Sequence, residues 1–550
     1  MSAPTTTTAP PGAQPMTHRQ TLEALSGLLL VLFVAMLSGT VVSIALPNII
    51  GALNGSQTQY TWVVTATLLT ATATTPIWGK LADLFNKKAL VQIAIVVFLL
   101  GSVVAGLSQS AEQLIAARAF QGIGVGGLQA LVQVAIAAMI PPRERGRYNG
   151  YLGAVMAVAT VGGPLLGGLI VDTSWLGWRW CFFVGVPVAA IALIILQATL
   201  HLPTTRRDNV KIDYLGALLI AAGVSVLLIW ISFVDNSFAW LSWQTAAMVG
   251  GSVILLALAT YVEARAAEPV VPLGIVRQHT TALAILGSLA VGMAMFGGAV
   301  FLGQYFQIGR GYSPTEAGLL TIPMMAGVLG SSIISGRMIT RSGRIKPYIV
   351  VGAVVLVIGF AVLGTIDHET PLWFVGAAMF LVGTGVGMTM QNLVLAVQNT
   401  VSLRDIGAAS STVAFFRSLG GTIGVSVLGA VLARRVSDQI TRDLAAAGVP
   451  TSGSGGASSS LDLNALPDAV QDIVRVAYGD ATGHIFFISA AIAVVGVIAA
   501  LLLRPVTLRS SLDLPGTAGP GTVDADPRDG DPGIEEAGVE TRRAAAPARH

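Results

Sequence analysis

Two arginines, Arg118 and Arg417, lie inside long apolar stretches of this 550-residue chain, away from the ends of those stretches. An ionisable side chain within a bilayer costs about 2.5–3.5 kcal/mol on insertion scales, so a charge that is kept there is a functional candidate. Arginine keeps its proton up to a pKa above about 12, so neither residue can itself carry a proton. The alternative for each is a structural role, in which the guanidinium donates to backbone carbonyls. Arg417 is also flanked by Phe416 and by the pair Gly420-Gly421.

No carboxylate lies inside an apolar stretch, and the acidic residues near the membrane lie at the ends of these stretches. These edge residues are Asp83, Glu112, Asp172, Asp213, Asp235, Glu263, Glu316 and Asp405. Asp83 lies near a helix end, where it could accept hydrogen bonds from backbone N–H groups without helical partners and so lock one conformation. A buried carboxylate would favour lipophilic cations. Because only arginines are embedded, we expect a neutral or weakly anionic, amphiphilic substrate.

Motifs for other chemistries are missing from the sequence. The one cysteine, Cys181, cannot form an internal disulfide, and no Cys/His cluster has the spacing of metal ligands. A phosphate-binding G-x-x-x-x-G-K-[ST] loop is absent, and the apolar stretches contain no paired carboxylates, metal ligands or Ser/His pair. The net charge of +3 is too small to indicate a nucleic-acid partner. We therefore expect neither an enzyme nor an ATP-driven pump, and no cofactor or metal.

Hydropathy predicts the elements that hold these residues. The chain is 53% hydrophobic but only 11% charged, against about 25% charged in soluble domains. Fourteen stretches are long enough to cross a bilayer as helices, which takes about 20 apolar residues. They are 25–46, 60–79, 89–110, 113–140, 148–171, 179–200, 214–234, 241–262, 280–306, 316–336, 347–366, 371–399, 406–433 and 484–504. The sequence therefore predicts an all-α polytopic membrane protein with 14 transmembrane helices.

The distribution of basic residues predicts the orientation. Sixteen Lys and Arg residues lie in loops on one side, and the short loops on the other side contain two, Arg179 and Arg310. The richer side is expected to be cytoplasmic, so both termini should be cytoplasmic in a cell membrane. Tails 1–24 and 505–550 are predicted to be disordered. An outer loop, 434–483, is expected to hold a flexible Gly/Ser tract from Thr451 to Ser460 and a short amphipathic helix around Leu466 to Tyr478.

Two predicted cytoplasmic turns resemble each other. Gly79 and Asn86 in the first are separated by seven positions, as are Gly336 and Gly343 in the second. In each turn a glycine allows close helix packing, and Asn86 or Gly343 is expected in a tight left-handed turn. Basic residues follow, namely Lys87, Lys88 and Arg344. A generic hairpin on the basic side of the membrane is the alternative, but the repetition favours an internal repeat.

The first turn, GKLADLFNKK from Gly79, resembles the cytoplasmic signature G-x-L-a-D-r-x-G-r-k of the major facilitator superfamily, with Leu84 in place of Arg and Asn86 in place of Gly. Further matches follow in order: Leu114 to Gly124 around Arg118, the antiporter motif from Gly163 to Gly168, Trp178 to Pro187, Asp213 to Gly216, Gly311 to Pro314 and Gln398-Asn399. The ordered set is similar to that of the fourteen-helix drug–proton antiporters of the EmrB/QacA type. The resemblance covers about residues 25–504.

This resemblance implies a fold of two six-helix bundles, 25–204 and 276–504, around a central cavity, with two extra helices in a linker, 205–275. It implies proton coupling or gating at Arg118, with Asp83 and Arg417 as further candidates. Motifs tied to conformational change contain Gly79, Lys87, Lys88, Gly122, Gly163, Pro164, Gly167, Gly168, Gly336, Gly343 and Arg344. The small residues Ala159, Gly163 and Gly167 also suit plain close helix packing.

The chain departs from the family in its first helix. Relatives commonly have an acid where this chain has Ser38, and a serine hydroxyl does not exchange a proton near neutral pH. The proton-carrying residue therefore stays open, and an edge carboxylate is a substitute. Cavity residues implied by the resemblance are Ser38, Gln129, Gln133, Phe301, Gln304, Tyr305, Gln307, Gln391 and Asn392. For each of the polar ones, a helix-packing hydrogen bond is the alternative.

The function implied is a proton-gradient-driven exporter of drugs or antibiotics that alternates access to small amphiphilic compounds and works as a monomer. A lipid, siderophore or metabolite exporter of the same fold is the alternative. The sequence identifies neither the substrate nor the proton stoichiometry.

Overall fold

The computed structural model describes residues 18–53, 57–140, 142–173, 175–200, 202, 213–234, 238–266, 269–271, 273–402, 405–446, 468–505 and 508. The chain divides into two compact units, Met1–Leu512 and Asp513–His550, and the second lies outside the described residues. The Gly/Ser tract from Thr451 to Ser460 also lies outside them, as do residues 1–17, 506–507 and 509–550 of the predicted tails 1–24 and 505–550. Within the first unit the structure is helical, which confirms the predicted fold class.

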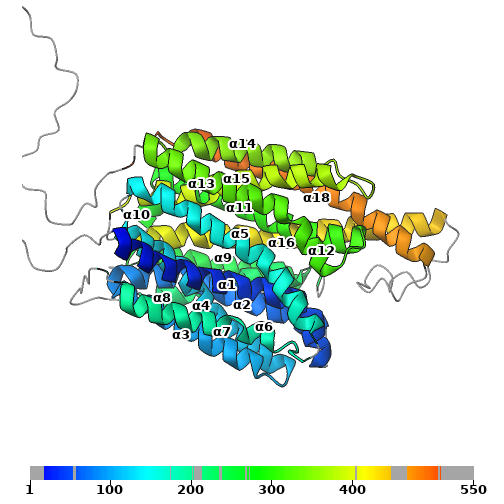
Figure 1. Ribbon diagram of the computed structural model, residues 1–550, viewed down its shortest axis with the longest axis horizontal. Helices are drawn as coiled ribbons and strands as arrows, with labels where there is room; N and C mark the ends of the chain where they lie inside the picture. The colour runs from blue at the N-terminus through cyan, green and yellow to red at the C-terminus, as the bar shows by residue number, and fades with distance from the viewer. Residues whose placement is uncertain are drawn as a thin grey trace, which may run out of the picture. The chain divides into compact units, whose positions relative to one another are not determined.

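The N-terminal set of helices packs around α4. Its members are α1 (His18–Ala52), α2 (Gln57–Leu84), α3 (Lys87–Gly106), α4 (Ala111–Met139), α5 (Pro142–Asp172) and the broken helix α6–α7 (Trp180–Phe183 and Gly185–Thr199). Helix α4 packs against α2 and α3, and α1 packs against α5 and α7 (Figure 1). Gly122 and Gly126 of α4 lie against α2, and Gly124 lies against α3, so glycines on two sides of α4 allow both helices to approach closely.

The C-terminal set has an equivalent arrangement. It contains α11 (His279–Gln304), which continues into the π-helical turn η1 (Tyr305–Gly309), α12 (Pro314–Leu320), α13 (Ile322–Ser342), α14 (Lys346–Leu363), α15 (Leu372–Gln398), α16 (Ile406–Ala446) and α18 (Asp468–Leu502). Helix α15 packs against α13 and α14, and α11 packs against α16 and α18. A single apolar cluster that includes Phe360, Leu395 and Phe486 fills the set.

Two inserted helices, α8 (Tyr214–Phe233) and α9 (Trp243–Glu263), lie between the two sets in the sequence and are followed by the short α10 (Leu273–Val276). They pack on each other, and α8 also contacts α2 and α16. An apolar cluster joins Ile220 and Val224 of α8 to Phe415 and Leu419 of α16. The inserted pair therefore covers the junction between one helix of each set.

The most extensive contacts between the two sets lie along two helix pairs. Helix α5 packs against α13, and α2 packs against α16 (Figure 1). We call the end of the helices that carries Asp83 and Gly343 the inner end, because the sequence predicts it to be cytoplasmic. The outer end carries Ala446 and Asp468.

Twelve helical stretches in the described residues are long and apolar enough to cross a membrane. They cover every predicted crossing except those of α2 and α5. Both of these helices have spanning length; α2 is less apolar because it is rich in threonine, and α5 begins with charged residues. The structure is thus that of a multi-pass membrane protein, and fourteen crossings stay a prediction.

The ends of three helices differ from the prediction. Helix α1 begins at His18, inside the predicted tail 1–24. Helices α16 and α18 extend into the predicted outer loop 434–483, so its described parts are helical. From Asp468 on, the amphipathic segment expected around Leu466 to Tyr478 belongs to α18. A hydropathy window misses these extensions because they are amphipathic. In α16, Val436, Ile440 and Leu444 are buried along one face, and the charged side chains lie on the other faces of the helix.

Candidate functional site

Asp83 joins the two helix sets at the inner end. Its carboxylate oxygens accept hydrogen bonds from the backbone N–H groups of Gly407 and Ala408, both at 2.8 Å, in the first turn of α16. These groups have no acceptor within their own helix, and the helix N-terminus favours a negative charge. Asp83, at the end of α2, therefore caps the N-terminus of α16 with its carboxylate.

Burial of Asp83 has a marked electrostatic effect. The residue lies four positions past the predicted crossing 60–79, and only 7% of its surface is exposed. Burial raises the pKa of the Asp83 carboxyl from 3.8 to about 7, because loss of water disfavours the charge more than the two backbone hydrogen bonds and the nearby Lys87 and Lys80 favour it. Asp83 can thus gain or lose a proton near neutral pH.

Gly79 allows this contact to form. A Cβ atom at Gly79 would collide with the side chain of Ser411 and would lie 2.7 Å from the carbonyl oxygen of Gly407. Only a residue without a side chain lets α2 approach α16 this closely. The sequence analysis expected close packing at Gly79, and the partner is the helix that Asp83 binds.

A second polar contact joins the sets at the inner end. Arg145, at the start of α5, is 1% exposed and donates from Nη1 to Oε1 of Gln398 in α15 at 3.2 Å. Its other nitrogens donate to the carbonyls of Ile140 (2.7 Å) and Ala137 (2.6 Å). Gln398 in turn donates to Ser410 of α16 at 2.9 Å. From the sequence, Arg145 was one of the basic residues that indicated the membrane orientation, and nothing in one sequence pairs it with Gln398.

The two repeated turns differ in backbone geometry. Gly343 has φ 69° and ends α13 in the left-handed conformation, as expected. The expectation for Asn86 is wrong: its φ is −62°, and its side chain accepts from the N–H groups of Lys88 and Ala89 as the N-cap of α3. An asparagine side chain satisfies the helix start directly, so no left-handed residue is needed.

Basic residues of these turns have varied surroundings. Lys88 donates from Nζ to the carbonyl of Gln197 at the end of α7, at 2.7 Å, whereas Lys87 is half-buried near Asp83. Arg344 is exposed, and Gly336 is buried within α13. The turns therefore share residue types but form different contacts.

Arg118 lies in a buried network that links four helices, α1, α2, α3 and α4. Its Nη1 donates to Oε1 of Gln121 at 2.6 Å, and its Nε lies 3.5 Å from the carbonyl of Val63. Gln121 connects Arg118 to two further helices: its Nε2 donates to Ser102 of α3 at 2.7 Å and to Ser38 of α1 at 3.2 Å. Ser38, at the position where the resemblance implies an acid, is thus separated from Arg118 by one side-chain amide, that of Gln121.

The sequence analysis did not select Gln121 as a site residue. A signal was available, since Gln121 follows Arg118 by three positions and so shares its helix face. Among the described residues, no carboxylate pairs with Arg118. The contact of Arg118 with the Val63 carbonyl fits the alternative of a structural arginine that donates to backbone carbonyls. The side chain of Gln121 is a further polar partner that this alternative did not include.

Arg417 lies in α16 and is 5% exposed. Its Nη1 is buried and has no hydrogen-bond partner among the described residues. The backbone carbonyl of Arg417 packs closely on Gly292 of α11. The structure thus places a guanidinium inside the C-terminal set without a counter-charge in the described part of the chain.

The remaining motif residues lie at helix contacts. Gly122 faces Thr70 of α2, Gly163 faces Thr40 of α1, and Gly168 faces Thr315 of α12. Gly167 is buried, and for Pro164 the structure describes only its place in α5. The close-packing reading of these glycines fits the geometry.

The predicted cavity residues do not all face one space. Gln391 contacts Met156 of α5 across the two sets, with 3.7 Å between Nε2 and the sulfur. Asn392 donates within its own helix to Met388 at 2.7 Å, and Gln133 has a buried Oε1 without a described partner. Ser38 belongs to the Arg118 network, and Gln129, Gln304 and Gln307 are half-buried.

The aromatic candidates pack inside the C-terminal set. The Tyr305 hydroxyl donates to the carbonyl of Asp367 at 2.8 Å and accepts from Arg310 at 3.2 Å. Phe301 is 3% exposed and lies against Gly429 of α16. In this conformation both side chains support the packing of the set, and Tyr305 holds the connection between α14 and α15.

Fold and contacts together are those of a polytopic transporter. Two helix sets are linked by a few polar contacts at the inner end, and the buried arginines have no carboxylate partner among the described residues. The family model of the Major Facilitator Superfamily matches residues 28–425, and the chain belongs to this superfamily. It is therefore a transporter and not an enzyme. The fourteen-helix subtype stays a prediction.

Individual relatives agree with this assignment. The MFS-type transporter Rv1877 of Mycobacterium tuberculosis is 36% identical over 488 residues, which are 89% of this chain and 70% of that protein. The multidrug transporter protein MdtP of Bacillus subtilis is 32% identical over 508 residues, which cover 88% of this chain and 93% of MdtP. The solved structure of the proton:xylose symporter XylE matches with a TM-score of 0.59 at 15% identity over 89% of this chain and 97% of that chain, which shows the shared fold alone.

Proposed function

We propose that the protein is a proton-driven exporter of small amphiphilic compounds that works by alternating access as a monomer in the cell membrane, with both termini cytoplasmic. The observation that carries the proposal is the contact of Asp83 with the start of α16. It joins the two sets by two hydrogen bonds and one titratable group at the inner end only. Such a contact can break without unfolding either set, which rocking of two repeats requires.

The direction of transport, out of the cell, is supported by relatives whose names include multidrug transporter and efflux pump. Proton coupling is supported by Asp83, because burial raises the pKa of its carboxyl to about 7 and it can therefore titrate near neutral pH. Arg118 and Arg417 would act on the proton or substrate by their charge, since arginine does not release its proton. We assign gating to Asp83 and coupling to Arg118 on these grounds.

The proton gradient is the first point to test. In cells that lack other pumps, expression of the protein should lower accumulation of a fluorescent amphiphile, and a protonophore should restore accumulation to the level of cells without the protein. An ionophore that collapses only the potassium gradient serves as the control. Efflux that continues at the same rate with the protonophore would contradict proton coupling.

Substrate charge is the second point. The described residues contain six buried charged side chains, and the carboxylates among them, Asp83 and Glu263, both lie near the inner end. The bundle interior thus offers guanidinium groups and no carboxylate to a substrate in the described part of the chain. We expect inverted vesicles to take up neutral or weakly anionic amphiphiles at least about tenfold faster than quaternary ammonium compounds of equal hydrophobicity, a difference of about 1.4 kcal/mol. Preference for permanently charged cations would contradict the assignment.

A further inference from the structure

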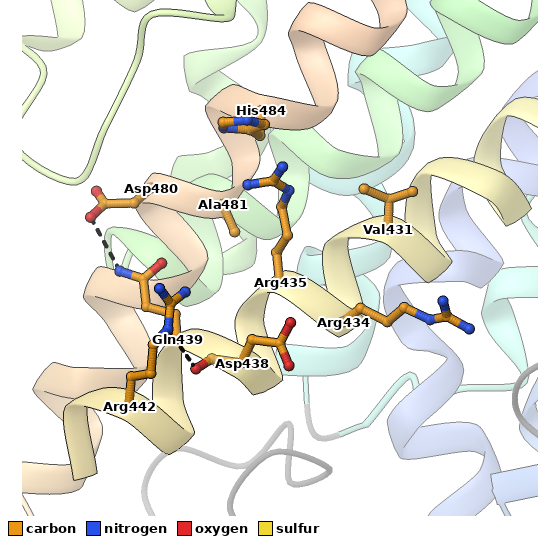
Figure 2. A pocket seen from close by; sticks show the side chains of 9 residues that line it. All are labelled: Val431, Arg434, Arg435, Asp438, Gln439, Arg442, Asp480, Ala481 and His484. Atoms are coloured by element: carbon orange, nitrogen blue, oxygen red, sulfur yellow. Dashed lines mark hydrogen bonds between the residues drawn. The ribbon is translucent and has the colours of Figure 1, made fainter. Parts of the chain in front are cut away.

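A cavity of about 590 Å³ lies between α16 and α18 at the outer end (Figure 2). Arg435, Gln439 and Arg442 line it from α16, and Asp480 and His484 line it from α18. The three α16 residues are spaced four and three positions apart, which places them on one helix face. Both helix segments belong to the extensions that continue past the predicted crossings, so the cavity lies at the predicted membrane surface.

Two guanidinium groups in this cavity have no described counter-ion. The Nε of Arg442 donates to the backbone carbonyl of Asp438 at 3.1 Å, and no carboxylate in the described residues pairs with Arg442 or Arg435. The carboxylate of Asp480 is already engaged, because it accepts from the backbone N–H of His368 at 3.2 Å, contacts His368 Nδ1 at 2.8 Å, and accepts from Gln439 at 3.4 Å. The lining of the cavity holds three arginines, Arg434, Arg435 and Arg442, against two carboxylates, Asp438 and Asp480, so positive charge is in excess.

The same cavity has an apolar side. Val431 and Ala481 also line it, and Val431 precedes Arg435 by four residues, about 6 Å along the helix axis. Val431 lies inside the predicted crossing 406–433, whereas Arg435 lies just beyond it. A ligand with a charged head and an apolar tail would fit this order, with its head at the arginines and its tail toward the bilayer.

We propose that this cavity binds the anionic headgroup, a phosphate or a carboxylate, of an amphiphile. Arginine presents a planar pair of donors that can bind either oxygen-rich group in a bidentate way. Arg435 and Arg442 share one face of α16, so they can contact one headgroup from two directions. The site lies outside the helices that carry Asp83 and Arg118, so it goes beyond the exporter function and does not depend on it.

The test is direct binding to the full chain in phosphatidylcholine nanodiscs. Octyl phosphate, titrated by calorimetry with empty nanodiscs subtracted, should bind in a saturable way, and octyltrimethylammonium should not. Arg435→Gln and Arg442→Gln should each weaken binding about tenfold or more, since hydrogen bonds to charged groups are the strong ones. Arg435→Lys keeps the charge and should weaken binding less. Arg341→Gln, which removes an exposed arginine at the inner end, is the matched control and should leave binding unchanged.

Two further arms separate the sources of the headgroup. Competition by inorganic phosphate would show that the free anion suffices, and native mass spectrometry of protein purified from phosphatidylglycerol nanodiscs would show whether a membrane lipid is retained through Arg435 and Arg442. Loss of either signal in the two glutamine variants supports the site. Equal binding in wild type, Arg435→Gln and Arg442→Gln, or no binding in any arm, would overturn it. Because no transport is measured, that failure would leave the exporter function standing.

Discussion

Replacement of Asp83 by asparagine is expected to lower transport about tenfold or more without lowering the amount of protein in the membrane. The carboxyl group presents two oxygen acceptors to the N–H groups of Gly407 and Ala408, and a protonated carboxyl still presents two. An amide has one oxygen, so its NH₂ group would face a second donor. A buried donor left without an acceptor costs about 1–3 kcal/mol, which corresponds to about tenfold or more in the population of the closed inner end.

The matched control is Asp405→Asn. Asp405 lies two residues before Gly407, and its carboxylate accepts from Ser402 of the same connection at 2.7 Å without reaching the N-terminal set through a described contact. Initial rates of dye efflux, normalised to protein in the membrane, should be close to wild type for Asp405→Asn. Equal rates for Asp83→Asn and wild type would remove Asp83 from the gate.

A pH dependence accompanies this contact. In the closed inner end the pKa of Asp83 is raised to about 7, whereas an exposed aspartate titrates near 3.8. The closed form therefore binds the proton more tightly, and this stabilisation is fully present below about pH 3.8 and is lost as the pH rises through about 7. Spin labels at Phe85 and Ser402, in a background without Cys181, should report shorter distances at pH 5.5 than at pH 8.5. Asp83→Asn should make the distance independent of pH.

Hydropathy alone predicted where the helices lie, because burial in a membrane imposes long apolar runs that any single sequence displays. It failed at α16 and α18, where charged residues on the outer faces hide an apolar stripe that includes Val436 and Ile440. The edge position of Asp83 indicated a helix terminus as its partner, but not which helix, since Gly407 lies 324 residues further along the chain. Pairings over such separations depend on how the two sets meet, which no local pattern encodes.

The buried polar residues show the same limit. Arg118 was identifiable because a charge in an apolar run is conspicuous, whereas Gln121, which connects it to Ser38 and Ser102, is an uncharged residue of a kind that also occurs at ordinary helix contacts. Arg145 was visible as a basic residue in a predicted cytoplasmic loop, yet its partner Gln398 is 253 positions away. Sequence thus identified the charges, and the fold identified the uncharged groups through which they act.

Arg118→Lys is expected to separate substrate movement from proton movement. The lysine keeps the positive charge inside the N-terminal set, so the fold should be retained. A single ammonium cannot hold both the Gln121 side chain and the Val63 carbonyl in the geometry of the guanidinium fork. Gln121 would then lose its fixed orientation toward Ser38 of α1, and with it the link between α4 and the first helix.

Two assays on proteoliposomes measure the separation. Exchange of labelled substrate across the membrane without a gradient should stay within about threefold of wild type. Substrate-driven proton flux, followed by a pH-sensitive dye inside the liposomes, should fall about tenfold or more, as expected from the loss of one hydrogen bond to a charged group. Arg179→Lys is the matched control, because Arg179 also donates to a backbone carbonyl, that of Ser108 at 3.3 Å, but lies at the outer end. If exchange and proton flux fall together in Arg118→Lys, Arg118 holds the helices in place and does not couple them to the proton.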